Sequence, residues 1–301
     1  MKKTTQVAAD RAYDQTKTVL PTEVARGVYM QNAPSLRALK LMHLMIGKAG
    51  GRMADDTRHE MRLSDIRKIE GMAHHDQESL KPLFAELRGA TIIYDEPEKK
   101  RWSIGGLLDQ GMVDYRHELT GDVLVSWYFG RMFRDMAEES NHWAILDRQT
   151  AFAMTSKYSV LLFQYFASLQ GLKHKTGEVF TVPQLRAMLG IEQGKSKRFA
   201  DLNRNILKPA ISEINQLSRF TLTATPRKIG RTVASVEISW EPKPDPTATK
   251  RELDSPKVGR KARRNGRAET PVVAFPALAA SAMPSRGRPS PRPTAAARIS
   301  T

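Results

Sequence analysis

The sequence predicts an α+β protein with two tandem winged-helix domains, and three observations support this prediction. The order helix, helix, β-hairpin occurs twice between residues 34 and 241. A short group of letters recurs at the same place in both copies. The composition changes after Trp240, where proline and arginine replace large apolar residues. We therefore expect four parts: a flexible N-terminal segment (1–33), a first winged helix (34–145), a second winged helix (146–241) and a disordered basic tail (242–301).

The first copy begins where the sequence becomes periodic. Apolar residues from Leu36 to Ile46 recur at helical spacing, and Gly50-Gly51 should end this helix. The sequence before Pro34 is only weakly patterned. The other expected elements are a short helix from Ser64 to Gly71, a second helix from about Asp76 to Arg88, and two strands, Thr91–Tyr94 and Arg101–Ile104.

A linking region, residues 106–155, separates the two copies. Gly111–Glu118, Asp122–Tyr128 and Trp143–Leu146 have the composition of strands. They could extend the first sheet or form a self-association surface, and the sequence does not decide between the two.

The second copy gives clearer signals. Ser156 should cap a helix that runs to Leu169 and is apolar on most faces, which is typical of a buried helix. Phe180 could form a short strand. The residues Thr181-Val182-Pro183-Gln184 make a capping-box start for a helix that ends at Gly190.

A longer helix and a hairpin should complete this copy. Apolar residues recur every three or four positions from about Ser196 to Leu217, which indicates a helix. Two β-rich runs follow, Phe220–Ala224 and Thr232–Trp240, around a basic turn at Pro226–Arg231. Helix, helix and basic hairpin make a winged helix-turn-helix.

The recurring letters are Leu80-Lys81-Pro82 with Glu86 and Leu207-Lys208-Pro209 with Glu213, at one spacing and in corresponding helices. This shared location indicates that the two copies follow one plan. Pro209 has no backbone N–H, so its helix should kink there or restart with Pro209 near the first turn.

The charge of the chain favours a polyanionic partner. The net charge is +16 and the pI is near 10.1, which indicates nucleic acid or an anionic membrane surface. From Pro242 to Thr301 there are 13 basic and 4 acidic residues. This tail should be disordered, with Arg260–Arg264 as a non-specific tether for polyanions, although a merely solubilising tail is the alternative. It lacks the apolar bulk that membrane binding requires.

The chain has no cysteine, which excludes disulfides, thiol nucleophiles and cysteine-ligated zinc. No signal-peptide h-region follows the N-terminus, and no apolar run is long enough to span a bilayer. We expect a protein of the cytoplasm.

No motif predicts a catalytic, cofactor or metal site. A P-loop needs four residues between its glycines and a preceding strand, whereas Gly190 and Gly194 enclose three residues and follow a helix. A nicking relaxase needs two histidines that are separated by one other residue, so that both can bind a metal. His74-His75 are adjacent and are expected in a surface loop, because adjacent side chains do not face the same side. Glu138-Glu139 is expected on an exposed helix face.

The start of the second-copy helix is the strongest candidate for DNA contact. Its cations lie where the helix dipole disfavours them unless an anion is bound. Arg198 and Arg204 have the forked geometry that pairs with guanine, and Asn203 could pair with adenine. The lysines should contact phosphates, and the wing should reach the backbone or a minor groove. The alternative is an ordinary solvated basic face. The predicted DNA-binding set is Lys195, Ser196, Lys197, Arg198, Asn203, Arg204, Lys208, Arg227, Lys228 and Arg231.

The first copy offers a weaker set. Lys81 and Arg88 on its second helix accompany the acidic Asp76, Glu78 and Glu86. In its wing the basic run 99–101 faces the acidic residues of 95–98. We expect DNA backbone contacts or dimerisation there.

Several stretches of the second copy resemble the iteron-binding plasmid replication initiators. They are Ser156-Lys157-Tyr158-Ser159, Thr181 to Gly190 with Gln184-Leu185-Arg186 and Met188-Leu189-Gly190, and Ile206 to Ile211 followed by Glu213-Ile214-Asn215. The resemblance covers about residues 35–240 and is strongest between 145 and 240. By position it supports Lys197, Arg198, Asn203, Arg204 and Lys208 as the recognition set. The basic tail is outside the family pattern.

The resemblance implies a recognition helix of the second domain in the major groove, with backbone contacts and dimerisation by the first domain. It implies that monomers bind directly repeated origin sites and that dimers repress the protein's own promoter at an inverted repeat. It further implies no catalytic site, opening of an AT-rich region, and recruitment of the host initiator and helicase. A tandem winged-helix repressor without a replication role is the main alternative. A nicking relaxase is disfavoured, because no metal and tyrosine arrangement supports it.

Overall fold

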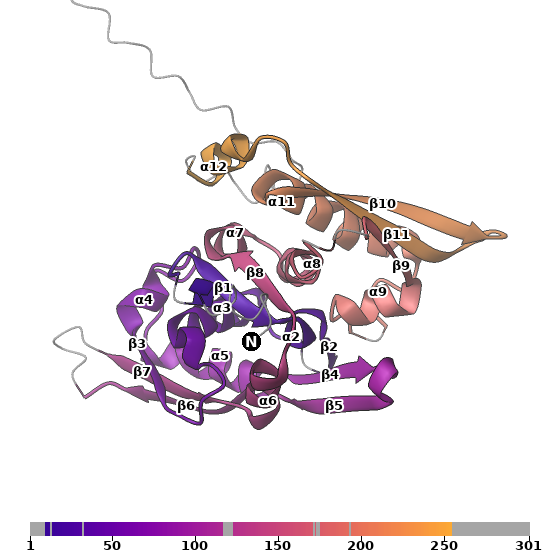
Figure 1. Ribbon diagram of the computed structural model, residues 1–301. Helices are drawn as coiled ribbons and strands as arrows, with labels where there is room; N and C mark the ends of the chain where they lie inside the picture. Colours follow the sequence, from indigo (N-terminus) through magenta and orange to yellow (C-terminus); the bar gives the residue numbers. More distant parts are fainter. Residues whose placement is uncertain are drawn as a thin grey trace, which may run out of the picture. The chain divides into compact units, whose positions relative to one another are not determined.

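Two helix–helix–hairpin copies follow one another in the computed structural model of the chain (Figure 1). The structure describes residues 10–12, 14–31, 33–116, 123–170, 172, 175–192 and 194–254. The predicted tether, Arg260–Arg264, lies outside the described residues, as does all of 255–301.

The first copy has the predicted helices and wing strands in the predicted order, and one strand that the sequence did not predict, β3. Ser35 caps its first helix by accepting a hydrogen bond from the Ala38 N–H, and Asp76 with Ser79 forms a capping box on its last helix. The elements are α3 (Leu36–Ala49), β3 (His59–Arg62), α4 (Leu63–Arg67), α5 (Gln77–Gly89), β4 (Thr91–Glu96) and β5 (Arg101–Gly106), with 3-10 turns at Gly50–Arg52 and Pro97–Lys99.

The prediction of a flexible N-terminal segment is wrong for residues 17–31. They form β1 (Lys17–Pro21), α2 (Thr22–Arg26) and β2 (Val28–Gln31). β1 pairs with the distant β8 (Trp143–Asp147), and β2 pairs with the wing strand β4. Strands this short, with one partner far along the chain, leave no local period that sequence reasoning could detect.

Two strands of the linking region form a separate sheet with a strand of the first copy. β6 (Leu108–Asp114) and β7 (Leu124–Phe129) join β3 in the order β3-β7-β6, and they do not extend the wing sheet β2-β4-β5. Two helices follow: α6 (Arg131–Glu139), of which the sequence predicted only the exposed face that carries Glu138-Glu139, and α7 (Arg148–Ala153), which it did not predict. Of the two alternatives, extension of the first sheet is therefore wrong, and self-association stays a prediction.

The second copy also follows its predicted order. Ser156 accepts a hydrogen bond from the Tyr158 N–H, and the capping box of Thr181 and Gln184 forms as predicted. The wing sheet has the order β10-β11-β9. The elements are α8 (Lys157–Ala167), β9 (Gly177–Thr181), α9 (Val182–Met188), α10 (Phe199–Leu202), a π-helical turn (Asn203–Leu207), α11 (Lys208–Leu217), β10 (Phe220–Ile229) and β11 (Thr232–Pro242).

Part of the expected tail is ordered. β11 continues to Pro242, and α12 (Pro246–Asp254) packs on α11 and α7. Thr249 is buried, and its hydroxyl donates to the Ser218 carbonyl oxygen at 3.2 Å. The prediction of disorder from residue 242 is therefore wrong as far as Asp254. It failed because the prolines of this stretch precede the helix or start it, and proline is tolerated in both places.

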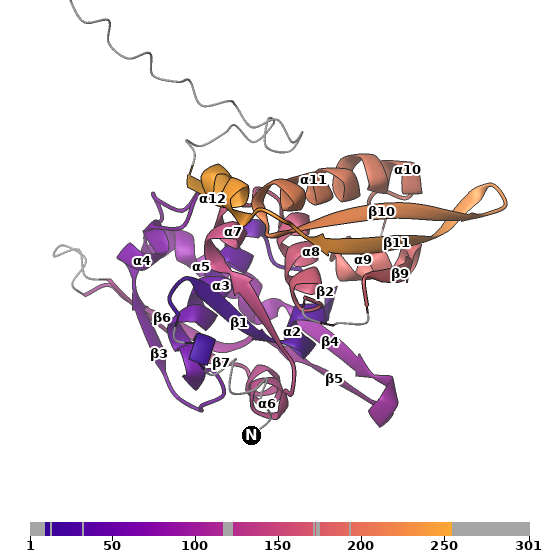
Figure 2. The same ribbon diagram turned by 45° about the horizontal axis from the view of Figure 1, so that its top comes forward.

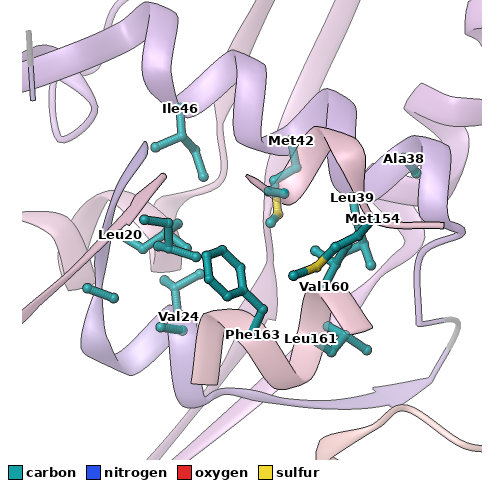
Figure 3. Packing of buried hydrophobic residues seen from close by; sticks show 14 of the residues in the cluster. Leu20, Val24, Ala38, Leu39, Met42, Ile46, Met154, Val160, Leu161 and Phe163 are labelled. Carbon is teal, nitrogen blue, oxygen red and sulfur yellow. The ribbon is translucent and has the colours of Figure 1, made fainter. Parts of the chain in front are cut away.

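One large hydrophobic core runs through both copies. Figure 3 shows Phe163 of α8 among Leu20, Val24, Met42 and Ile46, which come from β1, α2 and α3. Burial of such side chains stabilises a fold by roughly 1.5–3 kcal/mol each. The first helix of the second copy is therefore part of the same core as the first helix of the first copy.

The recurring glutamates have one structural role in both copies. Glu86 Oε2 accepts a hydrogen bond from the N–H of Ser35, the cap of α3, at 2.7 Å. Glu213 Oε1 accepts from the N–H and the hydroxyl of Thr155 at 2.7 and 2.8 Å, next to Ser156, the cap of α8. In each copy the last helix thus fixes the start of the first helix, which explains why the glutamate recurs.

Candidate nucleic-acid interface

The helix formed by α10, the π-helical turn and α11 presents two different faces. Leu202, Ile206, Leu207, Ala210 and Ile214 are buried against the core. On the other side Arg204, Asn205 and Lys208 are exposed, and Asn203, Ser212 and Asn215 are half-buried. The apolar residues thus hold the helix by one side and leave a polar stripe on the other. In a winged helix this is the side that can enter a groove of DNA.

A π-helical turn interrupts this helix at its predicted contact residues. The Lys208 N–H donates to the Asn203 carbonyl oxygen, five residues earlier, instead of the usual four. Pro209 follows in the first turn of α11, where its missing N–H is tolerated. The prediction of a kink or restart at Pro209 is thus confirmed as a restart. The π-helical turn itself was not predicted.

The cations before the helix lie in a loop rather than in a first helical turn. The helix begins at Phe199 with Arg198 at the N-cap, so the predicted start near Ser196 is three residues early. Lys195 and Lys197 are exposed, and Ser196 has a left-handed φ of 50°. Sequence reasoning missed this because nothing in the letters marks Ser196 for a positive φ.

Arg186 of α9 holds this loop in place. Its guanidinium donates to the carbonyl oxygens of Lys195 at 2.8 Å and Lys197 at 3.0 Å, and also to that of Ser196. These hydrogen bonds fix the backbone of the loop, while the side chains of Lys195 and Lys197 are exposed. Arg186 was not among the predicted site residues, because its partners are backbone atoms of a loop and carry no sequence signal.

Some predicted contacts are ion-paired inside the protein, and others are not. Arg204 pairs with Asp201 at 3.1 Å, Lys195 with Glu192 at 3.3 Å, and Arg227 with Glu237 at 2.6 Å. Exposed pairs of this kind contribute little to stability, so a phosphate or base edge can replace the carboxylate. Five further predicted residues are exposed and have no ion pair with any described residue: Lys197, Arg198, Lys208, Lys228 and Arg231.

The wing is longer than predicted, and its turn is shorter. Residues 226–229, which the sequence assigned to the turn, continue β10, and only Gly230-Arg231 connect it to β11. Gly230 has a φ of 61°, which a tight hairpin turn requires at this position. Figures 1 and 2 show the resulting hairpin projecting from the rest of the second copy.

A groove of about 830 Å³ lies between α11 and the wing strand β10. Lys208, Ser212 and Asn215 line one side, and Ala224 and Pro226 line the other. The Asn215 amide donates to the Leu222 carbonyl oxygen at 2.9 Å and accepts from its N–H at 2.6 Å. This pair of hydrogen bonds fixes the wing relative to the helix.

The equivalent surface of the first copy is less basic, as expected. Lys81 pairs with Glu78 at 2.7 Å, and Lys99 and Arg101 both pair with Glu96, at 2.6 and 2.7 Å. The Phe84 ring of α5 lies so close to Gly111 of β6 that a Cβ at Gly111 would collide with it. Strand β6 thus covers one side of the helix that corresponds to α11.

No group of three metal-ligating side chains occurs among the described residues. His75 is buried, and its Nδ1 lies 3.0 Å from Ser79 Oγ, so the prediction of a surface loop is wrong for His75. Glu138-Glu139 is exposed on α6, as predicted. The segment from Gly190 to Ser196 joins two helices, which is not the setting of a P-loop. Within the described ranges, no helix is both long and apolar enough to cross a membrane.

Comparison with known proteins assigns both copies. Residues 24–167 match the family model "Initiator Replication protein, WH1", and residues 181–240 match "Initiator Rep protein, WH2". The first match includes α8, which the sequence assigned to the second domain, and the boundary at 145 stays a prediction. The predicted fold of two tandem winged helices is confirmed.

One solved structure with a TM-score above 0.5 shares the fold of this chain. The Pi initiator protein, crystallised in complex with iteron DNA, matches with a TM-score of 0.54 and 16% identity, over 77% of this chain and 99% of that one. Domains 2 and 3 of RctB match with a TM-score of 0.40 and 10% identity, over 68% of this chain and 80% of that one. A search of curated proteins finds no match.

Proposed function

Because the chain belongs to the family of initiator Rep proteins, we propose that it initiates plasmid replication by binding directly repeated origin sites through its second winged helix. The observation that supports this most is the exposed stripe of Arg204, Asn205 and Lys208, flanked by a basic loop and a basic wing. The fold neighbour with bound iteron DNA agrees with the proposal. In this role the chain is a DNA-binding protein and not an enzyme.

Individual residues have different proposed roles. Arg204 and Arg198 recognise guanine edges, and Asn203 or the more exposed Asn205 recognises adenine. The lysines at 195, 197 and 208 contact phosphates, which fix the register of the helix on the duplex. The polar Ser196 contacts the same backbone. In the wing Arg227, Lys228 and Arg231 reach the flanking backbone or minor groove.

The first winged helix has a supporting role in this proposal. Its cations are largely paired with acids, which favours dimerisation or backbone contacts over base reading. Dimers would repress the protein's own promoter at an inverted repeat, and monomers would bind the direct repeats. The bound protein would open an AT-rich region in the cytoplasm and recruit the host initiator and helicase.

Footprinting on DNA from around the protein's own gene tests the proposal. The assay is run at physiological salt, because phosphate contacts make affinity salt-dependent. We expect protection at regularly spaced direct repeats next to an AT-rich stretch. Protection of a single palindrome over the promoter would instead support a repressor without a replication role. Uniform coating of all DNA would contradict sequence-specific recognition.

A further inference from the structure

The tip of the second wing carries an exposed apolar side chain among cations. Ile229 is 75% exposed, more than any other large hydrophobic residue of the described chain. Lys228 precedes it, and Arg231 lies in the turn that follows it. An apolar side chain in contact with water is unfavourable, and the core of the second copy lies too far along the hairpin to bury it.

The hairpin holds Ile229 at the end of a narrow arm. β9 pairs with β11 only between Ser235 and Ser239, so the sheet has two strands beyond that point. Figures 1 and 2 both show this arm extending past the body of the second copy. Its end is well defined, since Ile229 pairs with Thr232, whose hydroxyl donates to the Ile229 carbonyl oxygen at 3.2 Å.

We propose that Ile229 is a wedge that enters the minor groove and partly unstacks one base step when the recognition helix is bound. This proposal rests on the proposed function, because it needs the helix to place the wing on DNA. Lys228 and Arg231 hold the phosphates on either side of the groove, and the apolar side chain enters between the bases. Apolar wedges of this kind, inserted from the minor groove, kink the duplex toward the major groove.

The wedge would also favour particular sequences that the wing does not read by hydrogen bonds. Pyrimidine–purine steps such as TA unstack most easily, so a repeat with such a step under the wing costs least to distort. Binding at the repeats would then bend the origin DNA. This gives the wing a mechanical role in addition to its electrostatic one.

Fluorescence of 2-aminopurine tests the proposal in the full-length protein. The analogue replaces each adenine of a footprinted repeat in turn, and its emission rises when its base is unstacked. We expect a several-fold rise at one step beside the recognition sequence for the unaltered chain. Ile229→Ala should lose this rise and bind about tenfold more weakly, because the buried apolar surface is lost. Ile229→Met should keep most of both.

Two controls isolate the effect of the Ile229 side chain. Val179→Ala, on the outside of β9, removes another exposed apolar side chain (49% exposed) and should change neither emission nor affinity. A mismatch placed at the unstacked step should restore most of the affinity of Ile229→Ala. If the unaltered protein protects the repeats without any rise in emission, or if Ile229→Ala keeps the rise, the wedge is wrong and the proposed function stands. If no specific protection occurs at all, both are wrong.

Discussion

The last helix of the first copy and that of the second copy are alike on the side that packs and different on the side that faces solvent. Leu80 and Leu207 occupy equivalent buried positions. Glu86 and Glu213 also correspond, and the carboxylate of each fixes the start of another helix. On the outer side Glu78 of the first copy corresponds to Asn205 of the second. One scaffold therefore carries two surfaces of different charge.

The ends of the two helices differ in the same sense. In α5 the helix begins with Asp76, and hydrogen bonds from the backbone and side chain of Ser79 lower the pKa of this carboxyl, so it stays ionised and complements the helix dipole. In the second copy Arg198 occupies the N-cap, with no side-chain cap. The first helix start is satisfied by the protein itself, whereas at the second a cation takes the N-cap position and no side chain caps the helix.

The largest expected effect is a difference in stability between variants of the two glutamates, Glu213 and Glu86. Glu213 is 1% exposed and accepts two hydrogen bonds, whereas the half-buried Glu86 accepts one. Glu213→Ala should lower the free energy of unfolding by about 3 kcal/mol, because two donors lose a charged acceptor. Glu86→Ala should cost about half as much, and Glu213→Gln should fall between. Urea denaturation of the three variants measures this order, and equal losses at both positions would contradict it.

A second difference lies in the first helices. His43 of α3 and Gln164 of α8 both lie eight residues after their N-cap serine, and both are buried. Burial, and then the nearby Arg148 guanidinium, lower the pKa of His43 to about 4. Below about pH 6.5 His43 is therefore protonated in the unfolded chain but stays neutral in the folded chain. The free energy of unfolding should fall by roughly 1.4 kcal/mol per pH unit, or about 2 kcal/mol by pH 5.

The matched variant is His43→Gln, which gives α3 the residue that α8 has at the corresponding position, Gln164. With this substitution the unfolded chain should bind about one proton fewer on acidification. The free energy of unfolding, measured by denaturation between pH 7 and pH 5, should therefore fall less steeply. Burial also lowers the pKa of His59 and that of His75, so a smaller slope of the same sign should remain. An unchanged slope would mean that His43 is not the residue responsible.

The outer faces differ most directly in DNA binding. Arg204→Ala should weaken binding to the specific repeat by about 1–3 kcal/mol and leave binding to random DNA nearly unchanged, if it recognises a base edge. Lys81→Ala, on the equivalent face of the first copy, should change neither. Titration of each variant against both DNAs at fixed salt measures this. Equal losses on the two DNAs would show that Arg204 contacts only phosphate.

Local signals explain what the sequence predicted correctly. Ser156 and Thr181 cap helices through contacts within a few residues, so their letters define the helix starts. β1 and β2 escaped prediction because their partners are distant. The predicted contact residues lie on one helix, in the loop before it and on one wing, but Arg186 and Asn215 act through backbone atoms that no letter identifies.

The smallest predicted difference concerns the two prolines. Pro82 lies inside α5, which stays α-helical, because the carbonyl that it leaves without a donor belongs to Glu78 in the first turn. Pro209 lies further along its helix, which begins at Phe199. The turn that precedes this proline is π-helical and carries Arg204 and Asn205. The proline therefore bears on the orientation of those two side chains.

Replacement of each proline isolates this effect. Pro209→Ala supplies a donor for the Asn205 carbonyl oxygen, so the turn can tighten to an α-helix and rotate the residues before it. We expect a gain in the free energy of unfolding of about 1 kcal/mol and a loss of specific affinity of similar size. Pro82→Ala should show the stability gain alone. If both variants bind the repeats like the unaltered protein, the π-helical turn does not position the contact residues, and the two helices differ only in the charges that they expose.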